Sequence, residues 1–95
     1  MINVNSHVSI TNNEIELHKL DDEWVVVDEK QEKVAVMNES AFLIWDCIRK
    51  KGKIKIQELC SIMSNQYSEI GKVQIECDIV EIVDLMIRER LLYEL

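Results

Sequence analysis

The stretch Lys33-Val34-Ala35-Val36-Met37-Asn38-Glu39-Ser40-Ala41 decides the fold that this sequence predicts. Its first part, Lys33–Met37, is rich in apolar residues and predicts a β-strand. Asn38 is a favourable N-cap residue for a helix. The apolar residues that follow recur at the spacing of one helical face: Ala41, Ile44, Trp45 and Ile48. A strand is therefore expected to run directly into a helix that starts at Asn38.

Upstream of this junction the sequence predicts further strands. Val8–Ile10 is a short candidate, and Ile15–Leu20 alternates apolar and polar residues with the period of a half-buried strand. Trp24–Val27 is β-branched and aromatic. The polar segment Asp28–Glu32 that follows is short, so Trp24–Val27 and Lys33–Met37 are expected to form an antiparallel hairpin.

Downstream of the junction the sequence predicts helices. The first helix ends in the cations Arg49–Lys51, which favour the negative end of the helix dipole, and Gly52 closes it. The second helix has one apolar face, and Ser68–Lys72 is expected to be a loop. That face comprises Ile56, Leu59, Cys60, Met63 and Tyr67.

The third predicted helix, about Val73–Arg90, has an apolar face wider than a single core contact requires. Five of its apolar residues fall within one arc of the helix circumference, and three more apolar residues lie outside that arc. Leu91–Leu95 is expected to be a terminal turn that packs back on the sheet. The arc holds Ile75, Ile79, Ile82, Val83 and Met86, and the outliers are Val80, Leu85 and Ile87.

Length and composition bound the class of protein. The chain of 95 residues is 47% hydrophobic and 31% charged, which suits one globular domain over residues 1–95. The net charge of −7 argues against nucleic acid as a partner, because phosphate binding depends on Lys and Arg. No apolar stretch predicts a membrane span, and the N-terminus lacks the pattern of a signal peptide. We therefore expect a cytoplasmic protein.

Residues that could carry chemistry are few. His7 and His18 have no Cys, Asp or Glu at metal-ligand or catalytic-triad spacing, which favours surface or edge-strand histidines. The spacings of Cys47, Cys60 and Cys77 fit no metal or redox motif, and we interpret them as reduced core or near-core residues. The sequence also lacks a Gly-rich phosphate loop. It predicts no catalytic residue, no metal and no cofactor, and hence no enzyme.

Five cations lie close together where the first helix ends: Arg49, Lys50, Lys51, Lys53 and Lys55. Strands followed by three helices would suit a winged-helix DNA-binding protein. However, the third helix carries five carboxylates against two arginines, and phosphates would repel it. A solvated helix end is the favoured interpretation of the cluster, and a docking patch for an acidic protein is the alternative.

The strand Lys33–Met37 is expected to have a free edge, because helices begin immediately after it. A free edge offers unpaired N–H and C=O groups to which an extended peptide can add as a further strand. The third helix would form the other wall of such a groove. The alternative is that the N-terminal segment covers the edge and that the additional apolar residues are core. These features alone leave both readings open.

Three motifs of the sequence resemble the PqqD-like family. The first motif is Trp24–Val27 with acidic residues on both sides. The second motif, Met37–Trp45, resembles the family's strand-to-helix junction, and the third, Asp78–Met86, resembles its late helix. The ending Glu89-Arg90-Leu91-Leu92 is similar to the family's closing motif, with Arg90 in place of Gly; Met37 likewise stands in place of Leu. The resemblance covers about Ile15–Leu95.

This resemblance implies an α+β fold: a three-stranded antiparallel sheet followed by three helices, winged-helix-like. It also implies the role of a RiPP recognition element, which binds the leader segment of a ribosomally synthesised precursor peptide. In that family the leader adds to the third strand and lies against the third helix. Carried over by position, the peptide-binding residues are Lys33, Val34, Ala35, Val36, Asp78, Ile79, Ile82, Val83 and Met86.

The leading hypothesis is a standalone recognition protein of natural product biosynthesis that presents the leader to a modifying enzyme. The resemblance implies a radical SAM enzyme or a lasso-type leader protease as that partner. The alternatives are a winged-helix-like scaffold or regulatory domain that binds a partner protein, and a small DNA-binding regulator. A free strand edge is also a route to a homodimer.

Overall fold

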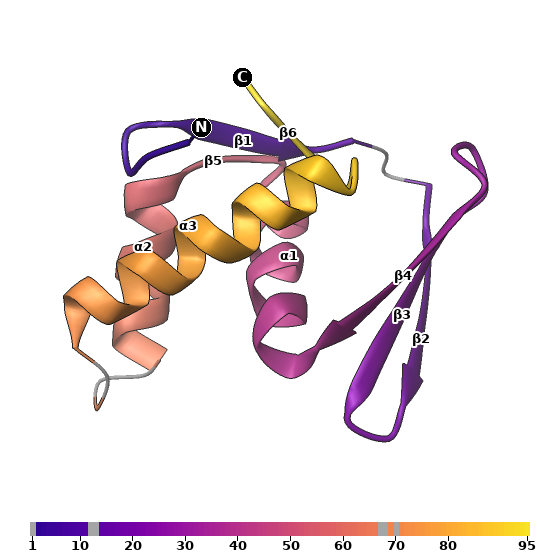
Figure 1. Cartoon of the computed structure of the whole chain (residues 1–95), viewed down its shortest axis with the longest axis horizontal. Coiled ribbons are helices and arrows are strands. Elements are labelled where there is room, and N and C mark those ends of the chain that lie inside the picture. The colour runs from indigo at the N-terminus through magenta and orange to yellow at the C-terminus, as the bar shows by residue number, and fades with distance from the viewer. Residues whose placement is uncertain (1, 12–13, 67–68, 70) are drawn as a thin grey trace.

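The computed structural model of the chain describes residues 2–11, 14–66, 69 and 71–95 (Figure 1). Three helices and six short strands are present in this part of the chain. In chain order they are β1 (His7–Ile10), β2 (Glu16–Leu20), β3 (Glu23–Asp28), β4 (Lys33–Asn38), α1 (Glu39–Lys51), β5 (Lys53–Lys55), α2 (Ile56–Gln66), α3 (Lys72–Arg88) and β6 (Leu92–Glu94).

The strands form two separate antiparallel sheets. The hairpin sheet has the order β2-β3-β4, and the terminal sheet has the order β5-β1-β6. Figure 1 shows the two sheets on different sides of α1. The predicted α+β class, the three-stranded antiparallel sheet and the β3–β4 hairpin are confirmed. The prediction of one sheet alone was wrong, because the terminal sheet accompanies it.

Two segments that were expected to be turns form the edges of the terminal sheet. Lys53–Lys55 lies within the cationic cluster, yet Ile54 between the two lysines is 1% exposed and pairs with Val8 of β1. On the other edge Leu92, also 1% exposed, pairs with Ile10. Each of these three-residue strands therefore contributes one fully buried apolar side chain to the core.

α1 begins and ends as the sequence predicts. The side-chain oxygen Oδ1 of Asn38 accepts a hydrogen bond of 2.8 Å from the backbone N–H of Ala41, which satisfies one of the free amides of the first turn. Gly52 follows the helix at φ 81°, a conformation that side chains with a Cβ rarely adopt. Trp45 and Ile48 are buried, and α1 packs on strands of both sheets. It is the shared layer of the fold.

α2 and α3 pack on one another and complete the core. The apolar face expected for the second helix is buried where the structure describes it, and the expected Tyr67 lies outside the described residues. α3 ends at Arg88 and not at Arg90. Arg90 has φ 60°, the backbone N–H of Arg90 donates to the carbonyl of Ile87, and that of Leu91 donates to the carbonyl of Met86. This is the hydrogen-bond pattern of a Schellman motif.

Among the described residues, no helix is both long and apolar enough to cross a lipid bilayer.

Candidate functional site

β4 forms an open edge of the hairpin sheet. Each of its six residues pairs with β3, from Lys33 opposite Asp28 to Asn38 opposite Glu23, and no other described strand pairs with β4. The described N-terminal strand β1 pairs with β5 and β6 instead. Of the two readings that the sequence left open, coverage of this edge by β1 is therefore wrong. The outer backbone N–H and C=O groups of β4 are available to a further strand.

The side chains of β4 alternate between two environments. Val34 and Val36 are 63% and 60% exposed, whereas Met37 is buried and Ala35 packs against the core. Alternation with period two is the property of a strand that has one face on a core. A peptide added beside β4 would continue this alternation, with every second side chain directed to the core side, where α1 and α3 lie.

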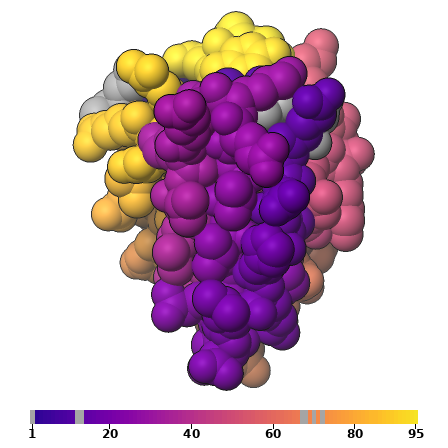
Figure 2. Space-filling view, turned by 90° about the vertical axis from the view of Figure 1, so that its right-hand side faces the viewer, coloured from indigo at the N-terminus to yellow at the C-terminus, as the bar shows by residue number. Residues whose placement is uncertain are grey.

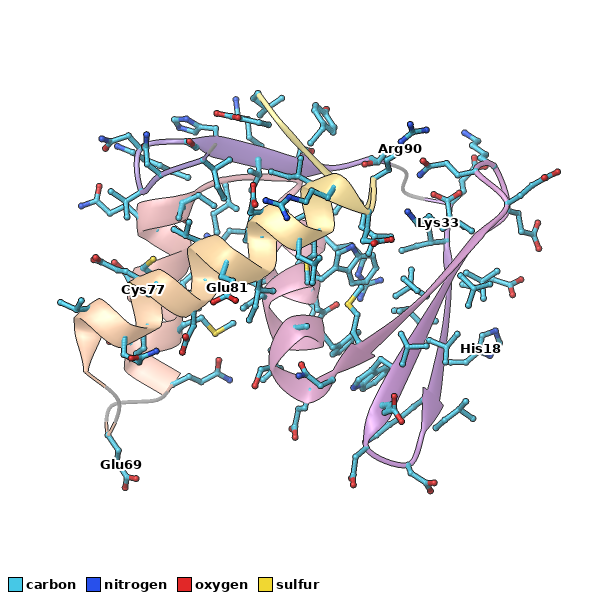
Figure 3. All side chains as sticks on the ribbon, viewed as in Figure 1. His18, Lys33, Glu69, Cys77, Glu81 and Arg90 are labelled. Atoms are coloured by element: carbon cyan, nitrogen blue, oxygen red, sulfur yellow. The ribbon has the colours of Figure 1, made fainter. Side chains whose placement is uncertain are left out.

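One end of β4 is fastened to the end of α3. Lys33 Nζ forms an ion pair of 3.0 Å with Glu89 Oε2 and also donates to the Glu89 carbonyl. Beside it, Gln31 Nε2 donates to the carbonyl of Arg90 at 3.0 Å and to Asp28 Oδ2 at 2.7 Å. Figure 3 shows Lys33 and Arg90 at this same end of the molecule. We call Asp28, Gln31, Lys33, Glu89 and Arg90 the clasp.

A cavity of about 380 Å³ lies among the three helices, next to the other end of β4. Ser40, in the first turn of α1, follows the end of β4 by two residues and forms part of its wall. One wall of the cavity thus begins two residues after the open edge ends. Its lining residues are Ser40, Ile44, Met63, Ile75, Asp78, Ile79, Glu81 and Ile82, and we call it the helix pocket.

The structure divides the third-helix residues predicted to bind a peptide. Asp78, Ile79 and Ile82 line the helix pocket. Val83 and Met86 are 0% and 4% exposed, belong to the core cluster and do not line the pocket, and their contact with a peptide stays a prediction. Nothing in an apolar repeat distinguishes a buried wall from a buried core, which is why the sequence could not make this division.

Five residues of the helix pocket were absent from the predicted site. The sequence predicts Ile44, Met63 and Ile75 on apolar helix faces and Glu81 on a solvated face. Only the packing of three helices reveals that these faces leave a space between them. Together with Ser40, the missed residues are Ile44, Met63, Ile75 and Glu81.

The outer face of the hairpin sheet is the second apolar surface. The register aligns Glu16, Val27 and Val34 in one row and His18, Val25 and Val36 in the next. Figure 2 looks onto this face, and Figure 3 shows His18 directed away from the core. The valines form a continuous patch, and the strand β2 gives it a polar border. We call Val25, Val27, Val34 and Val36 the valine patch.

The potential chemical groups lie apart from both surfaces or are already paired. Both histidines are exposed, as predicted, and His18 lies 3.4 Å from Glu16. Among the cysteines, Cys60 is buried, whereas Cys77 is exposed, so the predicted place of Cys77 near the core was wrong. Burial raises the pKa of the half-buried Cys47 thiol, which leaves it protonated at neutral pH. Within the described residues, no cluster of His, Cys, Asp or Glu could hold a metal ion.

Three residues of the cationic cluster form ion pairs within the chain. Arg49 and Lys50 both bind Asp46, the latter at 3.0 Å. Lys51 binds Glu58 at 2.8 Å, and this carboxylate raises the pKa of Lys51. Three of the five cations thus share two acidic partners, Asp46 and Glu58, which agrees with a solvated helix end.

The fold and the site define a class of small α+β domain in which an open strand edge runs toward a pocket between helices. Residues 23–92 match the sequence profile of coenzyme PQQ synthesis protein D (PqqD), and the chain belongs to this family. The resemblance seen in the sequence is therefore confirmed.

A solved structure described as TbiB1 in complex with the TbiA(beta) leader peptide shares the fold with a TM-score of 0.71. It is 17% identical in sequence, and the similarity covers 88% of this chain and 93% of that chain. No curated protein sequence matches the chain.

Proposed function

We propose that this protein binds the leader segment of a ribosomally synthesised precursor peptide by adding it as a strand to β4. The observation that carries the proposal is the open six-residue edge of β4 beside the helix pocket. Membership of the PqqD family supports it. So does the fold shared with TbiB1, a protein solved with a leader peptide bound.

The proposed mechanism is capture without chemistry, so the protein itself is not an enzyme. Backbone hydrogen bonds to β4 supply affinity, and side chains that enter the helix pocket supply specificity. The peptide orders on binding, which lowers the affinity obtained per unit of buried area. The rest of the precursor is then held near a modifying enzyme at a raised effective concentration. We propose a radical SAM enzyme or a lasso-type leader protease as this partner, in the cytoplasm.

Titration of the purified chain with the leader encoded nearest its gene tests the proposal. We expect a dissociation constant well below about 100 μM, which corresponds to about −5.5 kcal/mol. Fluorescence anisotropy of a labelled leader provides the measurement, and a scrambled leader of the same composition is the control. Equal binding of both peptides, or no binding below 100 μM, would overturn leader capture by this chain.

A pair of proline variants tests the strand-addition mechanism itself. In an antiparallel strand, neighbouring residues alternate between bonding the partner strand and facing away from it. Of Val34→Pro and Ala35→Pro, one therefore removes a bond to β3 and the other removes a donor on the open edge. We expect one variant to lose stability and the other to stay folded but bind the leader at least tenfold more weakly. Full affinity in both folded variants would exclude pairing through this part of β4.

The same edge offers a site for a second copy of the chain. If two copies pair through β4, the leader must displace one of them, and its apparent affinity falls as the protein concentration rises. Sedimentation velocity with and without leader distinguishes a dimer of this kind from a monomer.

A second candidate function, a winged-helix-like scaffold that binds a partner protein, is favoured by the exposed valine patch. Val34 and Val36 are more than half exposed on the face away from α1. The double variant Val34→Thr/Val36→Thr keeps the β-branched shape but makes this face polar. Loss of binding to the neighbouring modifying enzyme with unchanged leader affinity would assign the patch to that enzyme. If the double variant keeps both its binding to the enzyme and its affinity for the leader, the scaffold function of the valine patch is excluded.

A further inference from the structure

The helix pocket combines an apolar floor with an acidic rim. Five of its eight lining side chains are Ile or Met, from all three helices. Its volume of about 380 Å³ is at the lower end of the range for small-molecule sites, so it has room for a bulky aliphatic or aromatic side chain. Asp78 and Glu81 are the charged residues of the lining, and both are exposed.

The two carboxylates share one face of α3, because residues three apart on a helix are neighbours. Oδ1 of Asp78 accepts a hydrogen bond of 2.8 Å from Gln74 Nε2, which leaves its second oxygen for another donor. Glu81 has no hydrogen bond or ion pair with any residue that the structure describes. Figure 3 shows it in the middle of α3.

No cation whose side chain the structure describes forms an ion pair with this rim. No cation is among the lining residues, and the basic residues of α1 all lie in its last turn, far along the helix from Ser40. α2 contains no Lys or Arg. Lys33 is held by Glu89, and Arg88 by Asp84 at 2.9 Å. An entering peptide therefore meets two carboxylates above an apolar cavity.

We infer that the helix pocket selects a peptide segment in which a large apolar side chain is followed or preceded, two positions away, by Lys or Arg. Side chains two apart lie on the same face of a strand. The apolar side chain enters the cavity while the cation reaches Asp78 and Glu81 at its rim. The inference deepens the proposed function and rests on it, since it assumes that a peptide pairs with β4.

The expected size of this preference is modest. Exposed ion pairs contribute about 0.2–1 kcal/mol, which corresponds to a change in affinity of about 1.4- to 5-fold for each carboxylate. The two together are expected to give a preference of about 2- to 25-fold for a basic peptide, and salt is expected to weaken it.

Selection from a displayed library of random 12-residue peptides against the full chain tests the inference. We expect enriched peptides to carry a large apolar residue with Lys or Arg two positions away. A synthetic peptide of that consensus is then compared with its Lys-to-norleucine analogue by fluorescence anisotropy. The double variant Asp78→Asn/Glu81→Gln should bind the basic peptide at least about 2-fold more weakly and the norleucine analogue with unchanged affinity.

Asp84→Asn is the matched control, because Asp84 is on the same helix but is paired with Arg88 and does not line the pocket. It should change the affinity for either peptide by less than about 2-fold. Enrichment without a basic preference, or equal loss in the control, overturns the inference and leaves peptide capture intact. If neither the library nor the neighbouring leader yields a binder, peptide capture itself is overturned, and the inference with it.

Discussion

The two sheets of this molecule each have three antiparallel strands but expose their edges very differently. Both edges of the terminal sheet are three-residue strands. The central residue of β5, Ile54, is buried, and so is the first residue of β6, Leu92. The hairpin sheet ends in β4, with six residues and two exposed valines. Short edge strands are a common way to prevent unwanted pairing. The longer, open edge of β4 therefore supports the proposal that a peptide adds to it, whereas the residues buried in β5 and β6 belong to the core.

The same substitution in the two sheets should give the largest contrast. Val8 in the centre of the terminal sheet is 0% exposed, and Val34 on β4 is 63% exposed. Val8→Ala is expected to lower the free energy of unfolding by about 2 kcal/mol, because it removes buried methyl groups and leaves a cavity. Val34→Ala should change it by less than about 0.5 kcal/mol. Urea denaturation measures both, and equal losses would contradict the division into a core sheet and a binding sheet.

Removing a clasp residue should loosen the hairpin sheet more than the terminal sheet. Gln31→Ala deletes the hydrogen bonds to Arg90 and to the buried Asp28, at an expected cost of about 1 kcal/mol. Hydrogen exchange should accelerate at the amides of β4 more than at those of β1. Gln57→Ala, on the exposed face of α2, is the control that should leave both sheets unchanged. Uniform acceleration across the two sheets would show that the clasp has no local role.

Replacement of Arg90, just before β6, by Gly should raise the free energy of unfolding. Arg90 holds φ 60° just before β6, a conformation that costs about 1 kcal/mol for a residue with a Cβ. Arg90→Gly relieves this cost but adds freedom to the unfolded chain, so a net gain of about 0.5 kcal/mol is expected. Arg88→Gly, two residues earlier within α3, should instead lose about 1 kcal/mol. A thermal melt of both variants provides the measurement, and the same sign for both would contradict the helix end described above.

Acid should lower the stability contributed by α1, the helix that packs on strands of both sheets. Burial acts to raise the pKa of Asp46 on α1, but the hydrogen bonds and charges of Arg49 and Lys50 outweigh it and hold the pKa below its ordinary value of 3.8. Its ion pairs therefore add stability that is fully present above pH 3.8 and is lost as the pH falls through the folded-state pKa. The effect is expected to be about 0.5 kcal/mol.

Urea denaturation between pH 2.5 and 5 checks this effect, with Asp46→Asn as the variant and Asp84→Asn as the comparison. Asp46→Asn should flatten the acid slope, whereas Asp84→Asn should not. An unchanged acid slope in Asp46→Asn would contradict a stabilising role of these ion pairs.

Local signals in the sequence predicted the hairpin sheet and α1 well. Alternation in Ile15–Leu20, the Asn38 cap and Gly52 each act within a few residues, so they can be read without knowledge of the rest of the chain. β5 and β6 escaped prediction because they depend on β1, some 45 and 85 residues away along the chain. A three-residue strand is too short for its pattern of apolar and polar residues to indicate the strand with which it pairs.

Only the α3 wall of the helix pocket could be predicted from the sequence. Family resemblance directed attention to β4 and α3, and the structure retains Asp78, Ile79 and Ile82 at the helix pocket. The opposite wall, Ser40, Ile44 and Met63, comes from two other helices. Which residues face one another across a space is a property of helix packing angles, and no periodicity within a single helix encodes it.

The clasp also bears on the kinetics of binding. By joining Lys33 to Glu89 and Gln31 to Arg90, it holds β4 and the end of α3 in place before any peptide arrives. A preorganised site needs no remodelling on encounter, so association is limited by the ordering of the peptide alone. Weakening the clasp should therefore slow the association rate and leave the dissociation rate of the docked leader largely unchanged. If leader capture occurs as proposed, we expect these polar contacts to set the association rate of a leader and not its dissociation rate.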